Sequence, residues 1–274
     1  MPALKNNSPS PAERFKRLAT SFRLPTIGAE MESRLLQSGS PQAFETVLEV
    51  FEMEASDRLE RRVERLLRAS HLPPAKTFET LDYSPFPAAL VYQIKELKRG
   101  EFVDRAENVL AFGVPGVGKT HVLQAIGHEL VRQGRSVLCT PAYALVQELL
   151  AAKRDLALPR LLRKLDLFEA VILDDIGYVQ QSHDEMEVLF TFLAERYERR
   201  SVLITSNLVF SEWEQIFRNP MTTAAAIDRL VHHCAILEFH KVPSRRGEEA
   251  KKRIKGKRAE SSGQSEAGQS DPAS

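Results

Sequence analysis

Residues 113–120 read Gly-Val-Pro-Gly-Val-Gly-Lys-Thr, which has the residue types and spacing of a phosphate-binding loop. Glycines let a backbone approach a phosphate closely and turn its N–H groups toward it. A helix that begins at the loop adds its positive N-terminal end to the same site. Residues 108–112 read as a short apolar strand and residues 121–132 as a helix. Because strand, loop and helix are the context that the motif requires, the pattern predicts a nucleotide-binding site.

Two side chains of the loop have chemistry of their own. The Lys119 ammonium is placed to contact the β- and γ-phosphates of a nucleotide. The Thr120 hydroxyl is placed to ligate Mg²⁺. We expect the whole loop to bind the nucleotide, and its residues are Gly113, Val114, Pro115, Gly116, Val117, Gly118, Lys119 and Thr120.

Polar residues with matching chemistry follow two later apolar stretches. Residues 170–173 form an apolar run that leads into Asp174 and Asp175. A carboxylate at the end of a buried strand can hold the Mg²⁺ that bridges the phosphates, and we expect Asp174 to do so. Asp175 is expected to orient or deprotonate the attacking water. Asn207 follows the next apolar run, where its amide can hydrogen-bond the γ-phosphate or the water.

The elements that must position these residues alternate between strands and helices. Short apolar stretches separated by helical ones predict an α/β fold with a five-stranded parallel sheet covered on both faces. The expected strands are residues 108–112, 136–140, 170–173, 201–205 and 235–240. Ligands of such sheets bind at the carboxyl ends of the strands, so the loop, the two aspartates and the asparagine should meet at one edge.

The chain before the expected sheet reads as helical. Apolar periodicity predicts a helix from Pro11, a short helix around Met31, and a long helix over residues 41–70. Residues 71–87 contain four prolines and read as an ordered linker. Arginines spaced three or four apart share one face of the long helix, which could be a solvated face or a phosphate-contacting one. They are Arg58, Arg61, Arg65 and Arg68.

Composition narrows the class of protein. The 274 residues are 43% hydrophobic and 27% charged, and the formal net charge is +1, which is ordinary for a globular protein. The two cysteines, Cys139 and Cys234, imply no disulfide framework and favour a reducing, cytoplasmic location. No apolar run approaches the ~20 residues of a membrane span, so no membrane association is expected. Residues 1–10 and 244–274 read as disordered; the second segment is first basic, then acidic and serine-rich.

The motifs taken together resemble the IstB-like ATP-binding proteins, the AAA+ helpers of insertion-sequence transposition. They are also similar to the bacterial helicase loaders of the DnaC type. The Arg-Tyr-Glu-Arg-Arg and Thr-Ser-Asn…Ser-Glu-Trp wording favours the transposition helper. The matching stretches are residues 113–121, 171–178, 196–201, 204–207, 211–213 and 228–233.

The resemblance implies an AAA+ P-loop core that binds ATP with Mg²⁺ and hydrolyses it. It extends the nucleotide-binding stretch to His121 and makes Asn207 the sensor residue. It also makes Arg229 an arginine finger that reaches the nucleotide of a neighbouring subunit, although spacing alone favours a surface salt bridge. Lys119, Asp175, Asn207 and Arg229 are thus the expected catalytic residues.

The same resemblance implies partners and domains. Expected partners are non-specific duplex DNA, a transposase, and further copies of the chain joined through ATP-bridged interfaces. A helical domain over residues 11–74 would contact DNA and transposase, and an ATPase domain would span residues 75–243. The resemblance favours phosphate contact by the arginine face of the long helix. It adds a second DNA-binding set on a later helix, namely Arg160, Arg163 and Lys164.

One departure from the family pattern keeps alternatives open. The family often has Glu where this chain has Asp175, and the aspartate reaches about 1.5 Å less far. Hydrolysis is therefore expected to be slow or to depend on assembly. The alternatives to a transposition helper are a DnaC-like helicase loader and a nucleotide-gated DNA scaffold with negligible turnover.

Overall fold

The computed structural model describes residues 9–39, 41–176, 182–208, 230, 233–239 and 242–244. The chain divides into two compact units, Met1–Arg65 and Leu66–Ser274. The boundary falls within one long helix, α3 (Pro41–Ser70), whose predicted bounds are confirmed.

The N-terminal unit consists of helices packed around aromatic rings. Helix α1 (Pro11–Ser21) begins at a Ser10 capping box, and α2 (Pro25–Gln37) begins at the proline that ends the preceding turn. The Phe15 ring lies 5.4 Å from the Phe44 ring and 4.8 Å from the Phe51 ring, measured between centroids. These contacts join α1 to α3 through the apolar faces that the sequence periodicity indicated.

The second unit is built on a five-stranded parallel sheet, which confirms the predicted α/β class. The strand order among the described residues is β2-β3-β4-β1-β5. Strand β1 therefore lies between β4 and β5, and its last residue, Phe112, is level with Ser206 and Glu238. The strands are β1 (Asn108–Phe112), β2 (Val137–Pro141), β3 (Ala170–Asp174), β4 (Ser201–Ser206) and β5 (Cys234–Glu238).

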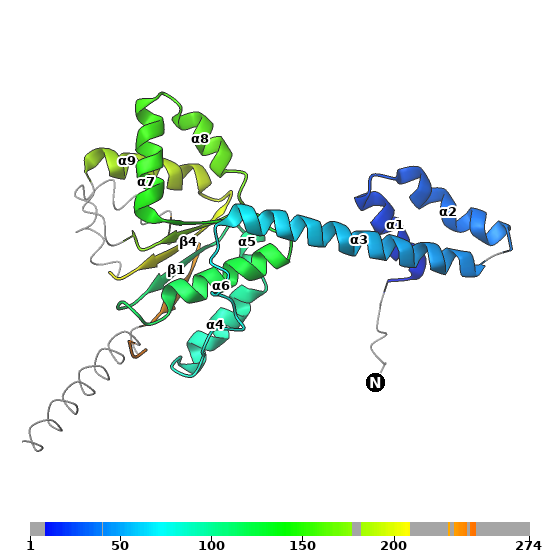
Figure 1. The fold of residues 1–274 in the computed structure, drawn as a ribbon, viewed down its shortest axis with the longest axis horizontal. Coiled ribbons are helices and arrows are strands. Elements are labelled where there is room, and N and C mark those ends of the chain that lie inside the picture. The colour runs from blue at the N-terminus through cyan, green and yellow to red at the C-terminus, as the bar shows by residue number, and fades with distance from the viewer. Residues whose placement is uncertain are drawn as a thin grey trace, which may run out of the picture. The chain divides into compact units, whose positions relative to one another are not determined.

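Helices cover both faces of this sheet, and Figure 1 shows α7, α8 and α9 on one face with α4 and α6 on the other. Successive side chains of a strand point to opposite faces of the sheet, so each face has its own set of buried residues. Leu110 and Phe112 of β1 pack in the cluster that contains residues of α7 and α9. The helices are α4 (Ala88–Lys98), α5 (Glu101–Asp104), α6 (Lys119–Arg132), α7 (Ala142–Arg154), α8 (Leu158–Leu165) and α9 (His183–Arg196).

Several predicted bounds shift by a few residues. Strand β2 is Val137–Pro141 rather than residues 136–140, and β5 is Cys234–Glu238 rather than residues 235–240. Helix α5 was not predicted, because a four-residue helix has too few positions to show a helical period. Within the part of the chain that the structure describes, no helix combines the length and apolarity needed to cross a membrane.

The predicted linker, residues 71–87, lies along helix α6, and we call it the strap. Near its start, His128 Nε2 lies 2.9 Å from the Pro73 carbonyl oxygen. Farther along, His121 Nε2 lies 3.1 Å from both the Thr77 carbonyl oxygen and the Thr80 hydroxyl. The strap is thus attached to the helix that follows the phosphate-binding loop, at several points along that helix.

Candidate nucleotide site

The backbone of the loop between β1 and α6 depends on its glycines. Gly116 has a φ of 85° and Gly118 a φ of 103°, values that side-chain-bearing residues rarely adopt. A Cβ atom added at Gly113 would lie 2.7 Å from Cβ of Phe239, which follows β5. The loop is therefore closely packed against the neighbouring strand, and substitution of either Gly113 or Gly118 would strain it.

Lys119, the first residue of α6, has a buried side chain beneath this loop. Its ammonium donates hydrogen bonds to the carbonyl oxygens of Gly113 and Val114, the second at 3.0 Å. A third hydrogen bond, 2.8 Å long, goes to Oδ1 of Asn207 beyond the end of β4. The cation is thus held between the loop and the residue that was predicted to sense the γ-phosphate.

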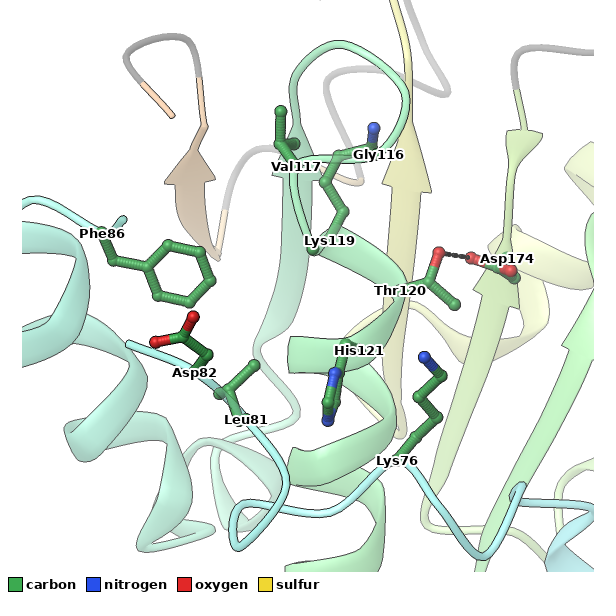
Figure 2. A pocket seen from close by; sticks show the side chains of 11 residues that line it. Lys76, Leu81, Asp82, Phe86, Gly116, Val117, Lys119, Thr120, His121 and Asp174 are labelled. Atoms are coloured by element: carbon green, nitrogen blue, oxygen red, sulfur yellow. Dashed lines mark hydrogen bonds between the residues drawn. The ribbon is translucent and has the colours of Figure 1, made fainter. Parts of the chain in front are cut away.

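Thr120 and Asp174 meet across the sheet edge, as the metal-site prediction requires. The Thr120 hydroxyl donates to Asp174 Oδ1 at 2.7 Å, as the dashed line in Figure 2 shows. Hydroxyl and carboxylate oxygens are ligands that Mg²⁺ prefers. These two side chains, from α6 and β3, therefore fit a magnesium ion that binds next to the phosphates.

Thr205, which is buried in β4, connects the two aspartates. Its hydroxyl donates to Asp174 Oδ1 at 2.7 Å and accepts from the Asp175 backbone N–H at 2.7 Å. Asp175 has a φ of 61°, in the left-handed region that L-residues visit at an energetic cost. The Thr205 hydroxyl stabilises this backbone conformation by accepting the Asp175 N–H.

Asn207 completes a connected set of hydrogen bonds. Its Nδ2 donates to Asp175 Oδ1 at 3.1 Å while its Oδ1 accepts from Lys119. A continuous network therefore runs from Thr120 through the two aspartates to Lys119. All of its members lie at or beyond the carboxyl ends of β1, β3 and β4.

A cleft of about 350 Å³ is lined by three members of this network, Lys119, Thr120 and Asp174. One side is formed by the loop and the first turn of α6, and Asp174 lies at its far side. The strap forms the remaining wall, and Figure 2 shows its side chains facing α6. These strap residues are Lys76, Leu81, Asp82 and Phe86. The size, the glycine loop and the two cation-binding oxygens suit a nucleotide polyphosphate with Mg²⁺.

Cys139 lies in β2 near the same edge but does not supply chemistry. Burial raises the pKa of its thiol to about 11, and Gln124 Nε2 lies 3.6 Å from the sulfur. The thiol therefore stays protonated and unreactive at neutral pH.

Among the described residues, the structure brings the predicted nucleotide-binding ones together at one edge of the sheet, whereas the predicted DNA-binding residues belong to both units. His121 contacts the strap, as described above. Arg160, Arg163 and Lys164 are exposed on α8, on the sheet face opposite α6. Arg229 lies outside the described residues.

The arginines of α3 have neighbours of their own. Arg58 and Arg61 both pair with Glu54, and the Arg58 guanidinium lies 4.2 Å from the Phe22 ring centroid. Arg65 is exposed, and Arg68 belongs to the second unit.

Sequence reasoning did not assign roles to Thr205, Lys76 or Arg196. Arg196 belongs to a stretch that resembles the family, but it is buried and structural. Its guanidinium donates to the carbonyl oxygens of Leu165, Phe168 and Ser201, each at 3.0 Å. Only the tertiary path of the chain could have identified these partners.

Comparison with known proteins identifies the family to which the chain belongs. The family model for IstB-like ATP binding proteins matches residues 19–252. A Sinorhizobium fredii protein described as an insertion sequence ATP-binding protein is 40% identical, over 81% of this chain and 76% of its own length. A Pseudomonas aeruginosa protein described as the ATP-binding protein of insertion sequence IS21 is 34% identical, over 81% of this chain and 84% of its own.

Solved structures show the same fold at low sequence identity. A crystal structure of DnaI superposes with a TM-score of 0.52 at 21% identity, covering 62% of this chain and 95% of DnaI. AMPPCP-bound DnaA from Aquifex aeolicus also gives 0.52, at 18% identity, covering 62% of this chain and 51% of DnaA. The chain therefore has the AAA+ P-loop fold.

Proposed function

We propose that this chain, which belongs to the family of IstB-like ATP-binding proteins, is an ATPase that assembles on duplex DNA and recruits or activates a transposase. The observation that carries the proposal is the hydrogen-bond network that joins Lys119, Asn207 and the two aspartates to Thr120. The relatives support the context, because they are described as insertion sequence ATP-binding proteins.

Each residue of the network has a distinct proposed role. Loop N–H groups and Lys119 bind the β- and γ-phosphates of ATP, with His121 beside them in the first turn of α6. Thr120 and Asp174 hold Mg²⁺, which neutralises charge on the phosphates when it is bound. Asp175 orients the attacking water, and Asn207 fixes the direction of its carboxylate through the 3.1 Å hydrogen bond. Their backbone positions at adjacent strand ends keep these groups in register.

The proposal explains why protomers assemble, because each nucleotide site needs a residue from a neighbouring copy. In the proposal, Arg229 of a neighbouring copy contacts the γ-phosphate, so bound ATP joins protomers and hydrolysis separates them. Lys and Arg side chains of α8 and α3 contact the phosphate backbone of duplex DNA without reading sequence.

The test is to measure, by sedimentation, whether the protein assembles on duplex DNA with and without Mg-ATP. The wild-type protein should form large complexes only when both ligands are present. Lys119→Ala should remain unassembled, because it removes the cation that contacts the phosphates. Equal assembly of Lys119→Ala and wild type would disprove the proposal, and a strong preference for single strands would favour the helicase-loader alternative.

One observation favours a second candidate, a nucleotide-gated scaffold with negligible turnover. The short Asp175 carboxylate is already engaged by Asn207, which limits its reach toward a water molecule. Phosphate release by wild type and Asp175→Asn, with duplex DNA and transposase present, decides between them. An ATPase should lose at least about tenfold in rate on this substitution, whereas a scaffold should show the same low rate in both proteins.

A further inference from the structure

Lys76 brings a second positive side chain to the nucleotide cleft, from outside the phosphate-binding loop. It lies on the strap, yet it lines the same cleft as Lys119, Thr120 and Asp174. Figure 2 shows its side chain rising from the strap beside the first turn of α6, with the amine directed toward Thr120. Lys76 is exposed, so its amine is accessible to a ligand in the cleft.

The strap backbone around Lys76 is fixed by hydrogen bonds. The Lys76 N–H donates to the Pro73 carbonyl oxygen at 3.2 Å, and the Thr80 hydroxyl donates to the Ala75 carbonyl oxygen at 2.8 Å. His121 holds Thr77 from the side of α6. The backbone is therefore ordered before any ligand binds, and only the lysine side chain must be immobilised.

Charge explains what such a lysine could bind. Among the described residues, Lys76 forms no ion pair with a carboxylate. A nucleoside triphosphate remains an anion after Mg²⁺ has bound, and Lys119 is the other lysine that lines the cleft. A second ammonium within reach would neutralise more of the phosphate charge in a partly enclosed cleft, where screening is weaker than in open solvent.

We propose that Lys76 is a phosphate-binding residue of the nucleotide site, supplied by the strap rather than by the loop. The inference rests on the proposed function, since it requires that the cleft binds a nucleotide. It has a structural consequence, because the strap follows directly after Ser70, the last residue of α3. Nucleotide binding then acts on the segment that joins α3 to the ATPase core, in addition to the loop itself.

Calorimetric titration of the full chain with Mg²⁺ and AMPPCP, a non-hydrolysable ATP analogue, tests the role of Lys76. Lys76→Gln removes the charge and keeps most of the side-chain length, and it should weaken binding about tenfold. The matched control is Lys95→Gln on α4, an exposed lysine that does not line the cleft; it should bind within about twofold of wild type. Lys76→Arg should retain most of the affinity, because it keeps the charge.

Salt dependence and folding separate a phosphate contact from damage to the strap. The affinity loss of Lys76→Gln should shrink as salt is raised, because screening weakens a charge–charge contact. Its melting temperature without nucleotide should equal that of wild type. If Lys76→Gln binds as tightly as Lys95→Gln while Lys119→Ala does not bind, the inference is wrong and the proposed function stands. If the wild type does not bind the analogue, both are wrong.

Discussion

Thr205 positions two acidic residues with one hydroxyl group. It donates to Asp174 and accepts from the Asp175 N–H, so both contacts disappear when the hydroxyl is removed. Thr205→Val keeps the shape of the side chain and should lower kcat about tenfold, with a higher Mg²⁺ concentration needed for half-maximal turnover. Thr205→Ser keeps the hydroxyl and should stay close to wild type. Steady-state ATP turnover as a function of Mg²⁺ concentration measures both effects.

The pattern of losses distinguishes positioning from general damage. AMPPCP affinity should change little in Thr205→Val, because Lys119 and the loop remain in place. A fall in kcat without a matching rise in KM would show that the aspartates are misplaced in the transition state. Equal Mg²⁺ requirements in the Val and Ser variants would show that the hydroxyl does not orient Asp174.

At the scale of single residues, local motifs predicted most of the site. The loop, Asp174 and Asn207 could be proposed from the sequence because each depends on a few neighbouring residues and on the end of an apolar strand. The role of Thr205 depends on β4 lying beside β3, which no local pattern encodes. Lys76 was missed because α4, α5 and β1 lie between it and the phosphate-binding loop in the sequence. It lines the cleft only because of the path that the strap takes in the structure.

Among the elements, the end of α9 is joined to β4 and to the α8–β3 connection by one buried arginine. Burial lowers the pKa of Arg196 to about 10, which still leaves it charged at neutral pH. Arg196→Lys should destabilise the fold by about 2 kcal/mol or more, because one ammonium cannot replace the spread of guanidinium donors. Chemical denaturation measures the loss, and exposed Arg199→Lys is the matched control.

The same variant should show a pH dependence of known sign. A lysine begins from a pKa of about 10.4, so burial at this position would lower it toward neutrality in the folded state. The unfolded chain then binds more protons than the folded one between the two pKa values, and stability rises with pH across that window. The difference in free energy of unfolding between wild type and Arg196→Lys should therefore become smaller from pH 7 to pH 9. A difference that grows over this range would contradict the explanation.

Helix α8 presents three exposed basic residues, whereas two arginines of α3 already pair with Glu54. Replacing Arg160, Arg163 and Lys164 together by Gln should therefore weaken duplex binding more than replacing Arg58 and Arg61. The plot of log affinity against log salt should lose about two to three units of slope if each side chain contacts one phosphate. Fluorescence anisotropy with a labelled duplex at several salt concentrations measures this slope. An unchanged slope would remove α8 from the DNA-binding surface.

The elements themselves were largely predictable, but their arrangement was not. Apolar periodicity located the long helix over residues 41–70, which is α3 in the structure. Strand lengths followed from short apolar runs. The order β2-β3-β4-β1-β5 could not be read from the sequence, because it depends on which strands form hydrogen bonds with one another in the complete sheet. The strap was expected to be ordered, but its attachment along α6 became visible only in the structure.

For the whole molecule, the proposal makes each active site the joint product of two copies of the chain. Lys119 acts on the nucleotide bound to its own protomer, whereas the proposed role of Arg229 is exercised on a neighbour. Lys119→Ala and Arg229→Ala should each be inactive alone on duplex DNA. Mixed in equal amounts, they should regain part of the wild-type ATPase rate, because an Arg229→Ala protomer can bind ATP and receive the arginine of a Lys119→Ala neighbour. A mixture as inactive as its components would place Arg229 in the site of its own protomer or outside any site, and a double variant carrying both substitutions is the control that must never be rescued.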